Sequence, residues 1–474
     1  MNTSKTYYTL FSALLLLFLL SCSGSVTEIK TGEDVQVWLT TGDEKHLFEQ
    51  MPGLAFAETT DEIPVIKVDT DKTYQTMDGF GYSLTGGSAY HLNRSITAEQ
   101  RKELLNELFG TEGNAIGISY LRISIGASDL DEQVFSYNDL PAGETDLNLE
   151  KFDLSPDYKD LIPVLKEILA INPGIKIMGS PWSAPAWMKD NNSPKGGKLK
   201  PEYYDVYARY FARYIKEMAK EGIVIDAITP QNEPENPKNN PSLVMTAEEQ
   251  TEFIKNNLGP VFEREGIKTK IVLFDHNCDN PEYPIAILND MEAKKYIDGT
   301  AFHLYLGEIE ALSQVQRAHP DKNLYFTEQW TSPQGTFDGD LRWHTRHLIV
   351  GAPRNWSRTV LEWNLAADEE FQPHTDQGGC TMCLGALTIE NSEIKRNVAY
   401  YIIAHASKFV RPGSVRVESN MPEDLFNVAF VTPAGKKVLI VINDGTHDRD
   451  FVIDSNGQKA HTRLQAGAVG TYVW

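Results

Sequence analysis

Two glutamates stand in segments whose neighbours could perform acid–base chemistry on a sugar. Glu233 lies in TPQNEP (229–234), and Glu328 lies in FTEQW (326–330). One carboxyl group of such a pair can protonate the leaving oxygen of a glycosidic bond while the other attacks or stabilises the sugar cation. Aromatic and amide side chains close to the ends of strand-like runs could hold the sugar: Trp182, Asn232, His303, Tyr305 and Trp363.

Each of these residues also has a plain structural interpretation. Taken singly, either glutamate would be an ordinary carboxylate at the end of a strand, where it could cap a helix. Tryptophans at the rim of a fold are often core residues, and His303 alone is better explained as a hydrogen-bonded core histidine. The functional interpretation therefore requires a fold that brings the two glutamates together.

The apolar pattern predicts such a fold. Stretches with helical spacing lie between most of the strand-like runs, for example 98–109, 203–220 and 247–265, and a last one at 392–410 follows the final run. This alternation predicts a (β/α)8 barrel, in which reactive residues lie at the carboxyl ends of the strands. The expected strands are 78–84, 118–125, 175–181, 223–230, 270–275, 300–306, 324–329 and 359–365.

Both ends of the chain have a different character from the barrel. After Arg411-Pro412-Gly413 come short strand-like runs separated by turn signals, and 35–40 and 65–68 are similar. The simplest assembly is a small antiparallel β-sandwich that both chain ends build beside the barrel. The expected boundaries are 22–76 and 411–474 for the two parts of the sandwich and 77–410 for the barrel.

The first 21 residues predict an export signal. Lys5 precedes the apolar run 10–20, which is too short to span a bilayer and suits a signal peptide. The run ends at Leu19-Leu-Ser-Cys22, which resembles the lipobox of bacterial lipoproteins. We therefore expect lipidation at Cys22 and an exported protein anchored to the outer membrane on its periplasmic or outer face. An ordinary secretory signal is the alternative.

Composition limits the classes of molecule that the protein can bind. The chain has 474 residues and a net charge of −22, so its field repels nucleic acid and anionic lipid, and a neutral sugar suits it better. Cys380 and Cys383 could form a short-range disulfide or two plain thiols that pin a loop. Because no second Cys-x-x-Cys is present and His276 and His374 lack ligand spacing, we do not expect a metal at this pair, and nothing else in the sequence calls for a metal or a cofactor. A monomer is the default expectation.

Several motifs in order resemble glycoside hydrolase family 30, the group of glucosylceramidases and β-1,6-glucanases. The resemblance runs from Gly79 to the end of the chain. Single motifs such as NEP recur in other barrel glycosidases, whereas the ordered set is specific. The motifs are DGFGYSLTGGSA, SPWSAPAWMK, QNEP, FHLY, FTEQW and KFVRPG.

The resemblance implies a retaining mechanism and assigns roles residue by residue. Glu233 matches the general acid/base, and Glu328 matches the nucleophile. Asn232 matches the residue that hydrogen-bonds the sugar 2-hydroxyl, and His303 fits a supporting role. The positions that line the subsite of the cleaved sugar correspond to Arg122, Asp129, Trp182, Tyr305 and Trp363.

The resemblance leaves the substrate open. The Gly-Gly-Cys-Thr-Met-Cys-Leu-Gly loop at 378–385 is similar to the branches that include endo-β-1,6-glucanases, which makes β-1,6-glucan the favoured substrate. An exo-acting β-glucosidase, glucosylceramidase or β-xylosidase is the alternative. A glycan-binding lipoprotein without catalysis is a different class, and it would need neither glutamate in a matched segment.

Overall fold

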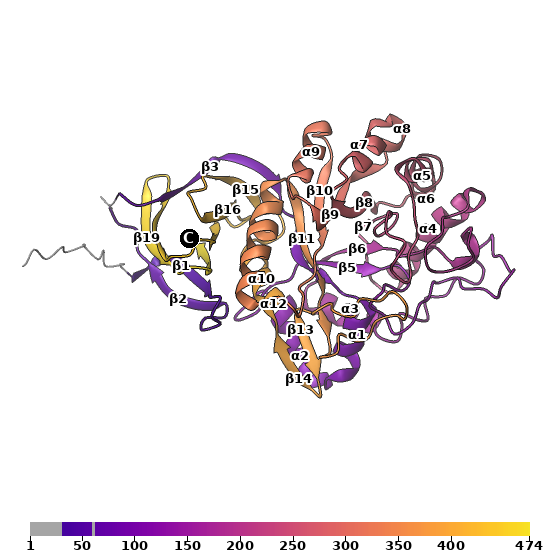
Figure 1. Ribbon diagram of the computed structural model, residues 1–474, viewed down its shortest axis with the longest axis horizontal. Coiled ribbons are helices and arrows are strands. Elements are labelled where there is room, and N and C mark those ends of the chain that lie inside the picture. Colours follow the sequence, from indigo (N-terminus) through magenta and orange to yellow (C-terminus); the bar gives the residue numbers. More distant parts are fainter. Residues whose placement is uncertain (1–30, 59–61) are drawn as a thin grey trace, which may run out of the picture.

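A closed barrel of parallel strands forms the larger part of the protein. The computed structural model describes residues 31–58 and 62–474. The strands follow one another around the barrel in the order β10-β11-β4-β5-β6-β7-β8-β9 (Figure 1). Every expected strand is present, so the predicted (β/α)8 barrel is confirmed. The strands are β4 (Gly79–Ser83), β5 (Tyr120–Ser124), β6 (Lys176–Ser180), β7 (Ala227–Ile228), β8 (Lys270–Cys278), β9 (Ile297–Gly307), β10 (Asn323–Glu328) and β11 (Ser357–Asn364).

Helices connect these strands and cover the barrel. The expected helix 98–109 is α2, which begins with a capping box between Thr97 and Gln100. The expected helix 247–265 forms α5 (Ala247–Phe253) and α6 (Gly259–Glu265), with one widened turn, Ile254–Leu258, between them. The other principal helices are α3 (Leu161–Ile171), α4 (Tyr204–Lys220), α7 (Glu282–Asn289), α9 (Ala311–Ala318), α10 (Phe337–His344) and α12 (Val398–Ser407).

The expected helix at 392–410 is wrong over its first residues. β13 (Leu387–Glu390) and β14 (Glu393–Arg396) form a hairpin in which Glu390 is paired with Glu393. Asn391 and Ser392 both have positive φ, at 50° and 66°, as a two-residue hairpin turn that matches the strand twist requires. The helix therefore begins only at Val398.

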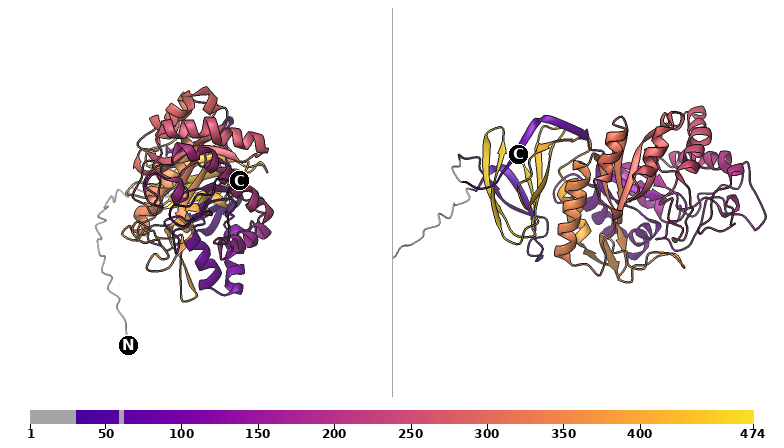
Figure 2. Two further views of the ribbon diagram at one scale, coloured as in Figure 1. Left: turned by 90° about the vertical axis from the view of Figure 1, so that its right-hand side faces the viewer. Right: turned by 45° about the horizontal axis from the view of Figure 1, so that its top comes forward.

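The two chain ends form one β domain beside the barrel, as expected (Figure 2). Its sheet has the strand order β19-β18-β3-β15-β16-β17-β20-β1-β2. β18 pairs with β3 in parallel, so the domain is not entirely antiparallel as predicted. β2 and β19 have no counterpart among the expected strands. The strands are β1 (Thr31–Thr40), β2 (Glu49–Leu54), β3 (Val65–Thr76), β15 (Val415–Ser419), β16 (Leu425–Val431), β17 (Lys437–Asn443), β18 (Arg449–Ser455), β19 (Gln458–Leu464) and β20 (Val469–Val473).

Alternation along β16 and β17 explains why the β domain stays attached to the barrel. Ala429 and Leu439 face the interior of the β domain, whereas Val428, Phe430 and Ile440 join the main core, which includes the barrel helices. Both faces of these strands are therefore buried, and the barrel covers one of them. The core is continuous from one domain to the other.

Residues 1–21 and Cys22 lie outside the described part of the chain. Among the described residues, no helix combines the length and the apolar character that a membrane span needs.

Candidate active site

Side chains fill the barrel interior in layers. The positions of the polar layer can be derived from those of the apolar layer below it. A lower layer holds one buried apolar residue from each of seven strands: Tyr120, Met178, Ala227, Val272, Ala301, Tyr325 and Leu361. Because inward-facing positions recur every second residue of a strand, the next inward layer lies two residues further on. On six of these strands that rule leads to Arg122, Ser180, Thr229, His303, Thr327 and Trp363.

Strand β8 departs from this spacing because it contains a bulge. The register between β8 and β9 shifts between Phe274 and His276. Phe274 and Asp275 have φ of 72° and 61°, values that ordinary residues seldom adopt. The bulge places Asp275, three residues after Val272, in the polar layer, where the side chain is fully buried.

Asp275 connects the polar layer. One of its carboxylate oxygens, Oδ2, accepts a hydrogen bond from Arg122 at 2.8 Å, and the other, Oδ1, lies 3.1 Å from Nε2 of His303. The hydroxyls of Thr229 and Thr327 donate to the same carboxylate at 2.8 and 2.7 Å. These partners hold the pKa of Asp275 well below its usual range, although burial raises it. A permanent negative charge therefore lies beneath the site.

Arg122 carries the matching positive charge and is fully buried. Its guanidinium donates to Glu328 Oε2 at 2.7 Å and to the Asn232 side-chain oxygen at 2.6 Å, in addition to Asp275. Buried charges are tolerated when they are paired and hydrogen-bonded, as they are here. One side chain thus orients two of the residues that the sequence analysis selected.

The two glutamates meet at His303. Nδ1 of its imidazole lies 3.3 Å from Glu233 Oε1 and 3.7 Å from Glu328 Oε1. The two carboxyl oxygens cannot be further apart than the sum of these distances. That limit admits the ~5–5.5 Å separation of retaining glycosidases and leaves only the lower end of the ~6.5–9.5 Å range of inverting ones.

Further hydrogen bonds fix both carboxyl groups. The Tyr305 hydroxyl donates to Glu328 Oε1 at 2.9 Å, so each oxygen of Glu328 has one donor. Asn236 and Asn239 lie 2.7 and 3.3 Å from Glu233 Oε2. Glu233 itself has a φ of 47°, and its backbone N–H donates to Asp275. Both glutamates are buried.

The two glutamates differ in their pKa values. Burial raises the pKa of Glu328, and this effect outweighs the charges of His303 and Arg122. Burial also raises the pKa of Glu233, but the hydrogen bond to His303 and the histidine charge outweigh it and lower this pKa to about 2. Despite burial, the charge of Glu328 and the hydrogen bonds to Asp275 and Glu233 raise the pKa of His303 to about 9. The His303–Glu233 pair therefore holds one proton, mainly on the histidine.

Aromatic rings form one wall of the site. The rings of Trp182 and Trp363 have centroids 5.5 Å apart, and the Arg122 guanidinium lies 4.9 Å from the Trp182 ring centroid. Both tryptophans are buried and pack against Leu130 and Cys383. The rings therefore have one face on protein and border the pocket as well.

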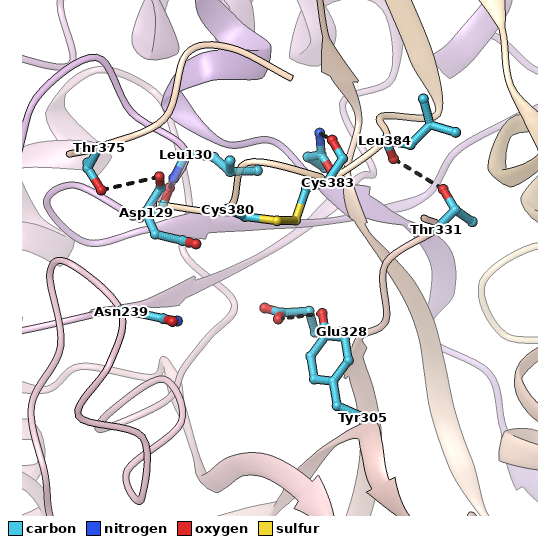
Figure 3. Close-up of a disulfide and its surroundings, with 12 residues drawn as sticks. Asp129, Leu130, Asn239, Tyr305, Glu328, Thr331, Thr375, Cys380, Cys383 and Leu384 are labelled. Carbon is cyan, nitrogen blue, oxygen red and sulfur yellow. Dashed lines mark hydrogen bonds between the residues drawn. A yellow bond between two sulfur atoms is a disulfide. The ribbon is translucent and has the colours of Figure 1, made fainter. Parts of the chain in front are cut away.

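Cys380 and Cys383 form a disulfide (Figure 3), and Cys383 packs against this wall. The loop that carries it is tied to neighbouring loops, because Thr375 N–H donates to Asp129 O at 2.9 Å and Leu384 N–H donates to Thr331 O at 3.2 Å. Figure 3 shows Asp129, Asn239 and Glu328 directing their polar ends into one space beneath the disulfide. Burial, together with the charges of Glu328 and Glu233, raises the pKa of Asp129 to about 8.

These residues surround a pocket of about 710 Å³ at the carboxyl ends of the barrel strands. Its volume lies within the ~300–1,000 Å³ of small-molecule sites. Glu233, Glu328, Asp129, Trp182, Tyr305 and Trp363 line it. Arg122, Asn232 and His303 lie directly beneath or beside them, so the structure brings together every described residue that the sequence analysis selected.

One further set could hold a metal ion. Glu233, His276 and His303 offer ligand atoms that lie within 4.8 Å of one another. Nitrogen and carboxylate ligands of this kind suit zinc and similar ions. The carboxylate of Asp275 on Nε2 of His303 is also the kind of partner that metal-bound histidines have.

From the sequence alone, the run Asp275-His276-Asn277 after the fifth strand could either touch a bound sugar or form a hydrogen-bonding cluster at the strand end. The two-residue spacing of the inward-facing layers finds the neighbours of Asp275 but leads to Phe274 on β8, because a bulge has no plain sequence signal. The resemblance also implies a raised pKa for the acid Glu233 and an arginine that keeps the nucleophile Glu328 ionised. Both pKa directions differ in the structure, because His303 lowers the pKa of Glu233 and burial raises that of Glu328.

The parallel barrel with two buried, facing carboxyl groups defines a barrel glycoside hydrolase. A model of the glycosyl hydrolase family 30 TIM-barrel domain matches residues 77–410, and a model of the β-sandwich domain of that family matches 413–472. The chain therefore belongs to glycosyl hydrolase family 30, and it is a glycoside hydrolase.

Similar proteins include the endo-1,6-β-D-glucanase neg1 of Aspergillus fumigatus, which is 31% identical over 84% of this chain and 85% of that protein. The lysosomal acid glucosylceramidase of Mus musculus is 26% identical over 86% of this chain and 83% of that protein. Among solved structures, the endo-β1,6-glucanase BT3312 superposes with a TM-score of 0.87 and 34% identity, covering 93% of this chain and 99% of that chain.

Proposed function

We propose that the protein is a retaining endo-β-1,6-glucanase in which Glu328 is the nucleophile and Glu233 the general acid/base. The observation that carries the mechanism is the single His303 nitrogen that lies between the two carboxyl groups. The likeness to the Aspergillus fumigatus protein and to BT3312, both named as endo-β-1,6-glucanases, supports the substrate.

In the first step, Glu328 attacks the anomeric carbon and the bond to the leaving oxygen breaks. Glu233 receives a proton from His303 across their 3.3 Å contact and passes it to that oxygen, which leaves Glu233 ionised. In the second step, Glu233 removes a proton from water, and the water displaces Glu328 from the sugar. Two displacements at one carbon retain its configuration.

The neighbouring residues assist each displacement. Arg122 and Tyr305 hold the two oxygens of Glu328 and fix the direction of attack. Because Arg122 occupies the Asn232 oxygen, the amide of Asn232 presents its N–H₂ group to a sugar hydroxyl. Trp182 and Trp363 provide a flat apolar wall for the ring, and the protonated Asp129 carboxyl can both donate to and accept from sugar hydroxyls.

Product analysis tests the substrate. The polymer pustulan, a β-1,6-glucan, is incubated with the protein beside aryl β-glucoside and aryl β-xyloside. A ladder of short β-1,6-linked oligosaccharides is the expected result. Glucose or xylose from the aryl glycosides with the polymer untouched would contradict endo action and favour the exo-acting β-glucosidase, glucosylceramidase or β-xylosidase alternative, which the mouse relative supports.

Two variants test the mechanism. Glu328→Gln removes the nucleophile, so turnover should fall by about 10⁴-fold or more while sugar binding persists. Glu233→Ala should regain activity on an activated aryl glucoside with azide, because that leaving group needs no proton. Wild-type turnover in purified Glu328→Gln protein would refute the nucleophile assignment. Glycan binding without any turnover by the wild type would instead favour the glycan-binding class.

We also propose that the exported protein is anchored through a lipid on Cys22. The apolar run before Leu19-Leu-Ser-Cys22 supports this. Labelling with radioactive palmitate in a bacterial host should mark the wild type and leave Cys22→Ala unlabelled. Label on both proteins, or on neither, would contradict the anchor.

A further inference from the structure

The pocket extends beyond the residues that would surround the cleaved sugar. The loop after β7 and the loop after β8 form this extension, and the end of β9 contributes Leu306. Polar side chains dominate its lining: Glu235, Asn236, Lys238, Asn239, Asp279 and Asn280. Asn239 and Asn280 are both partly exposed, as expected for groups that can reach a ligand.

This extension lies on the acid side of the bond to be cleaved. Glu233 Oε2 accepts from Asn236 at 2.7 Å, and the Asn239 amide lies 3.3 Å from the same oxygen. An acid that protonates a leaving oxygen must touch it. Side chains packed against the open side of the Glu233 carboxyl group therefore contact the leaving group, that is, the part of the substrate that carries the leaving oxygen.

The walls of the extension are held in place. Asn280 Nδ2 donates to both carboxylate oxygens of Glu235 at 3.1 and 3.2 Å, which ties the loop after β8 to the loop after β7. On the other side, the Asn240 amide donates to Asp376 O at 2.8 Å. A Cβ on Gly378 would lie only 2.7 Å from Lys238 O, so the disulfide loop packs directly on this segment.

The chemistry of the lining decides between a sugar and a lipid. Amide groups donate and accept hydrogen bonds and match the hydroxyls of a sugar. A ceramide would instead need a continuous apolar surface, because each buried CH₂ group contributes ~0.8 kcal/mol. Of the described lining residues in the loops after β7 and β8 and at the end of β9, only Pro237 and Leu306 are apolar, and Trp330 adds one aromatic ring to the pocket from the loop after β10.

We propose that Asn239 and Asn280 belong to a leaving-group subsite for a hydroxyl-rich sugar and that this subsite directs the enzyme to glycan chains instead of glucosylceramide. The inference rests on the proposed two-glutamate mechanism and names the kind of group that leaves. It requires no particular linkage between the sugars.

The experiment uses the glucosyl-enzyme. β-Glucosyl fluoride loads the nucleophile and releases only fluoride, and the intermediate then divides between water and an added acceptor, gentiobiose. The ratio of sugar product to water product reports the leaving-group subsite alone. Because a lost hydrogen bond is worth about 0.5–1.5 kcal/mol, Asn239→Ala and Asn280→Ala should each lower this ratio about threefold to tenfold.

The matched control is Asn106→Ala on α2, where the amide donates only to Lys102 O; this variant should keep the wild-type ratio. In a second arm, the wild type should cleave gluco-oligosaccharides at least 100-fold faster, by kcat/KM, than glucosylceramide in mixed micelles. The proposed subsite would be refuted if both subsite variants kept the wild-type ratio of sugar product to water product. It would also be refuted if the wild type cleaved glucosylceramide and gluco-oligosaccharides with equal kcat/KM. A wild type that does not release fluoride would instead refute the proposed mechanism itself.

Discussion

At the scale of single residues, the proton on the His303–Glu233 pair determines how the site responds to pH. Nε2 of His303 lies 3.1 Å from Asp275, whose charge is permanent, and Nδ1 faces both glutamates. A neutral Glu233 and a neutral His303 differ from their ion pair only by the position of one proton. The pair therefore loses that proton as a unit.

This pairing predicts both limbs of the pH profile of kcat/KM. The acidic limb reports ionisation of Glu328, and because burial raises the pKa of Glu328 it should lie above pH 4.5. The basic limb reports loss of the proton from the pair, which His303 retains up to a pKa of about 9. In His303→Gln the proton must stay on Glu233 alone, so the basic limb should move to lower pH.

The measurement is the initial rate on a gluco-oligosaccharide between pH 4 and 10. His461→Gln on β19, far from the pocket, is the control and should leave both limbs in place. A basic limb at the same pH in His303→Gln would show that the proton does not reside on this pair.

Residue types and order sufficed to predict the two glutamates and the rings, because strands of a parallel barrel end at one face. The role of Asp275 could not be predicted in the same way. Its inward position depends on the bulge at Phe274 and Asp275, and backbone geometry of this kind follows from tertiary packing.

At the scale of elements, the loop 375–385 packs on the tryptophan wall of the pocket and carries the disulfide. Cys383 packs with Trp182 and Trp363, and the loop contacts the backbone of Asp129. The bridge closes a loop of only four residues, so its effect on the unfolded chain is worth about 2 kcal/mol.

Reduction should therefore affect catalysis more than stability. Cys380→Ser/Cys383→Ser protein should lose about tenfold in kcat/KM, because the tryptophan wall and Asp129 lose their support, while its Tm falls by only a few degrees. Dithiothreitol should act in the same way on the wild type. Kinetics and thermal unfolding of both proteins provide the test.

Cys278→Ser is the matched control, since Cys278 is a buried free thiol in β8 outside the disulfide loop. If the double serine variant has the same kcat/KM as the wild type, the tryptophan wall keeps its position without the disulfide.

The hairpin β13–β14 shows why the prediction of a helix over 392–410 was wrong in its first residues. Leu387–Glu390 and Glu393–Arg396 alternate in burial, but the second segment also continues into the apolar spacing of α12. Only the positive φ of Asn391 and Ser392 separates the two structures, and those angles depend on pairing with β13.

At the scale of the whole molecule, both chain ends converge on one helix of the barrel. His405 of α12 hydrogen-bonds the hydroxyl of Thr40 in β1 and that of Thr471 in β20, each at 2.8 Å. It is fully buried, and the ring of Phe48 packs edge-on against it at 5.0 Å. A single side chain thus joins the barrel to strands from both ends of the sequence.

This junction should make the folded protein sensitive to acid. Burial lowers the pKa of His405 to about 3 from the 6.5 expected for an unfolded chain, so below pH 6.5 the unfolded chain binds a proton that the folded protein excludes. The stability that neutral His405 contributes is complete above pH 6.5 and is lost as the pH falls toward 3. At pH 5 the loss is about 2 kcal/mol.

The variant His405→Gln isolates this contribution, because an amide can donate to one threonine and accept from the other but does not titrate. Between pH 7 and pH 5 the Tm of the wild type should fall about 2 °C further than that of His405→Gln, with the carboxylates common to both proteins cancelling. Equal decreases would show that His405 also takes up its proton in the folded protein at pH 5, either in place or because the junction opens before the barrel unfolds.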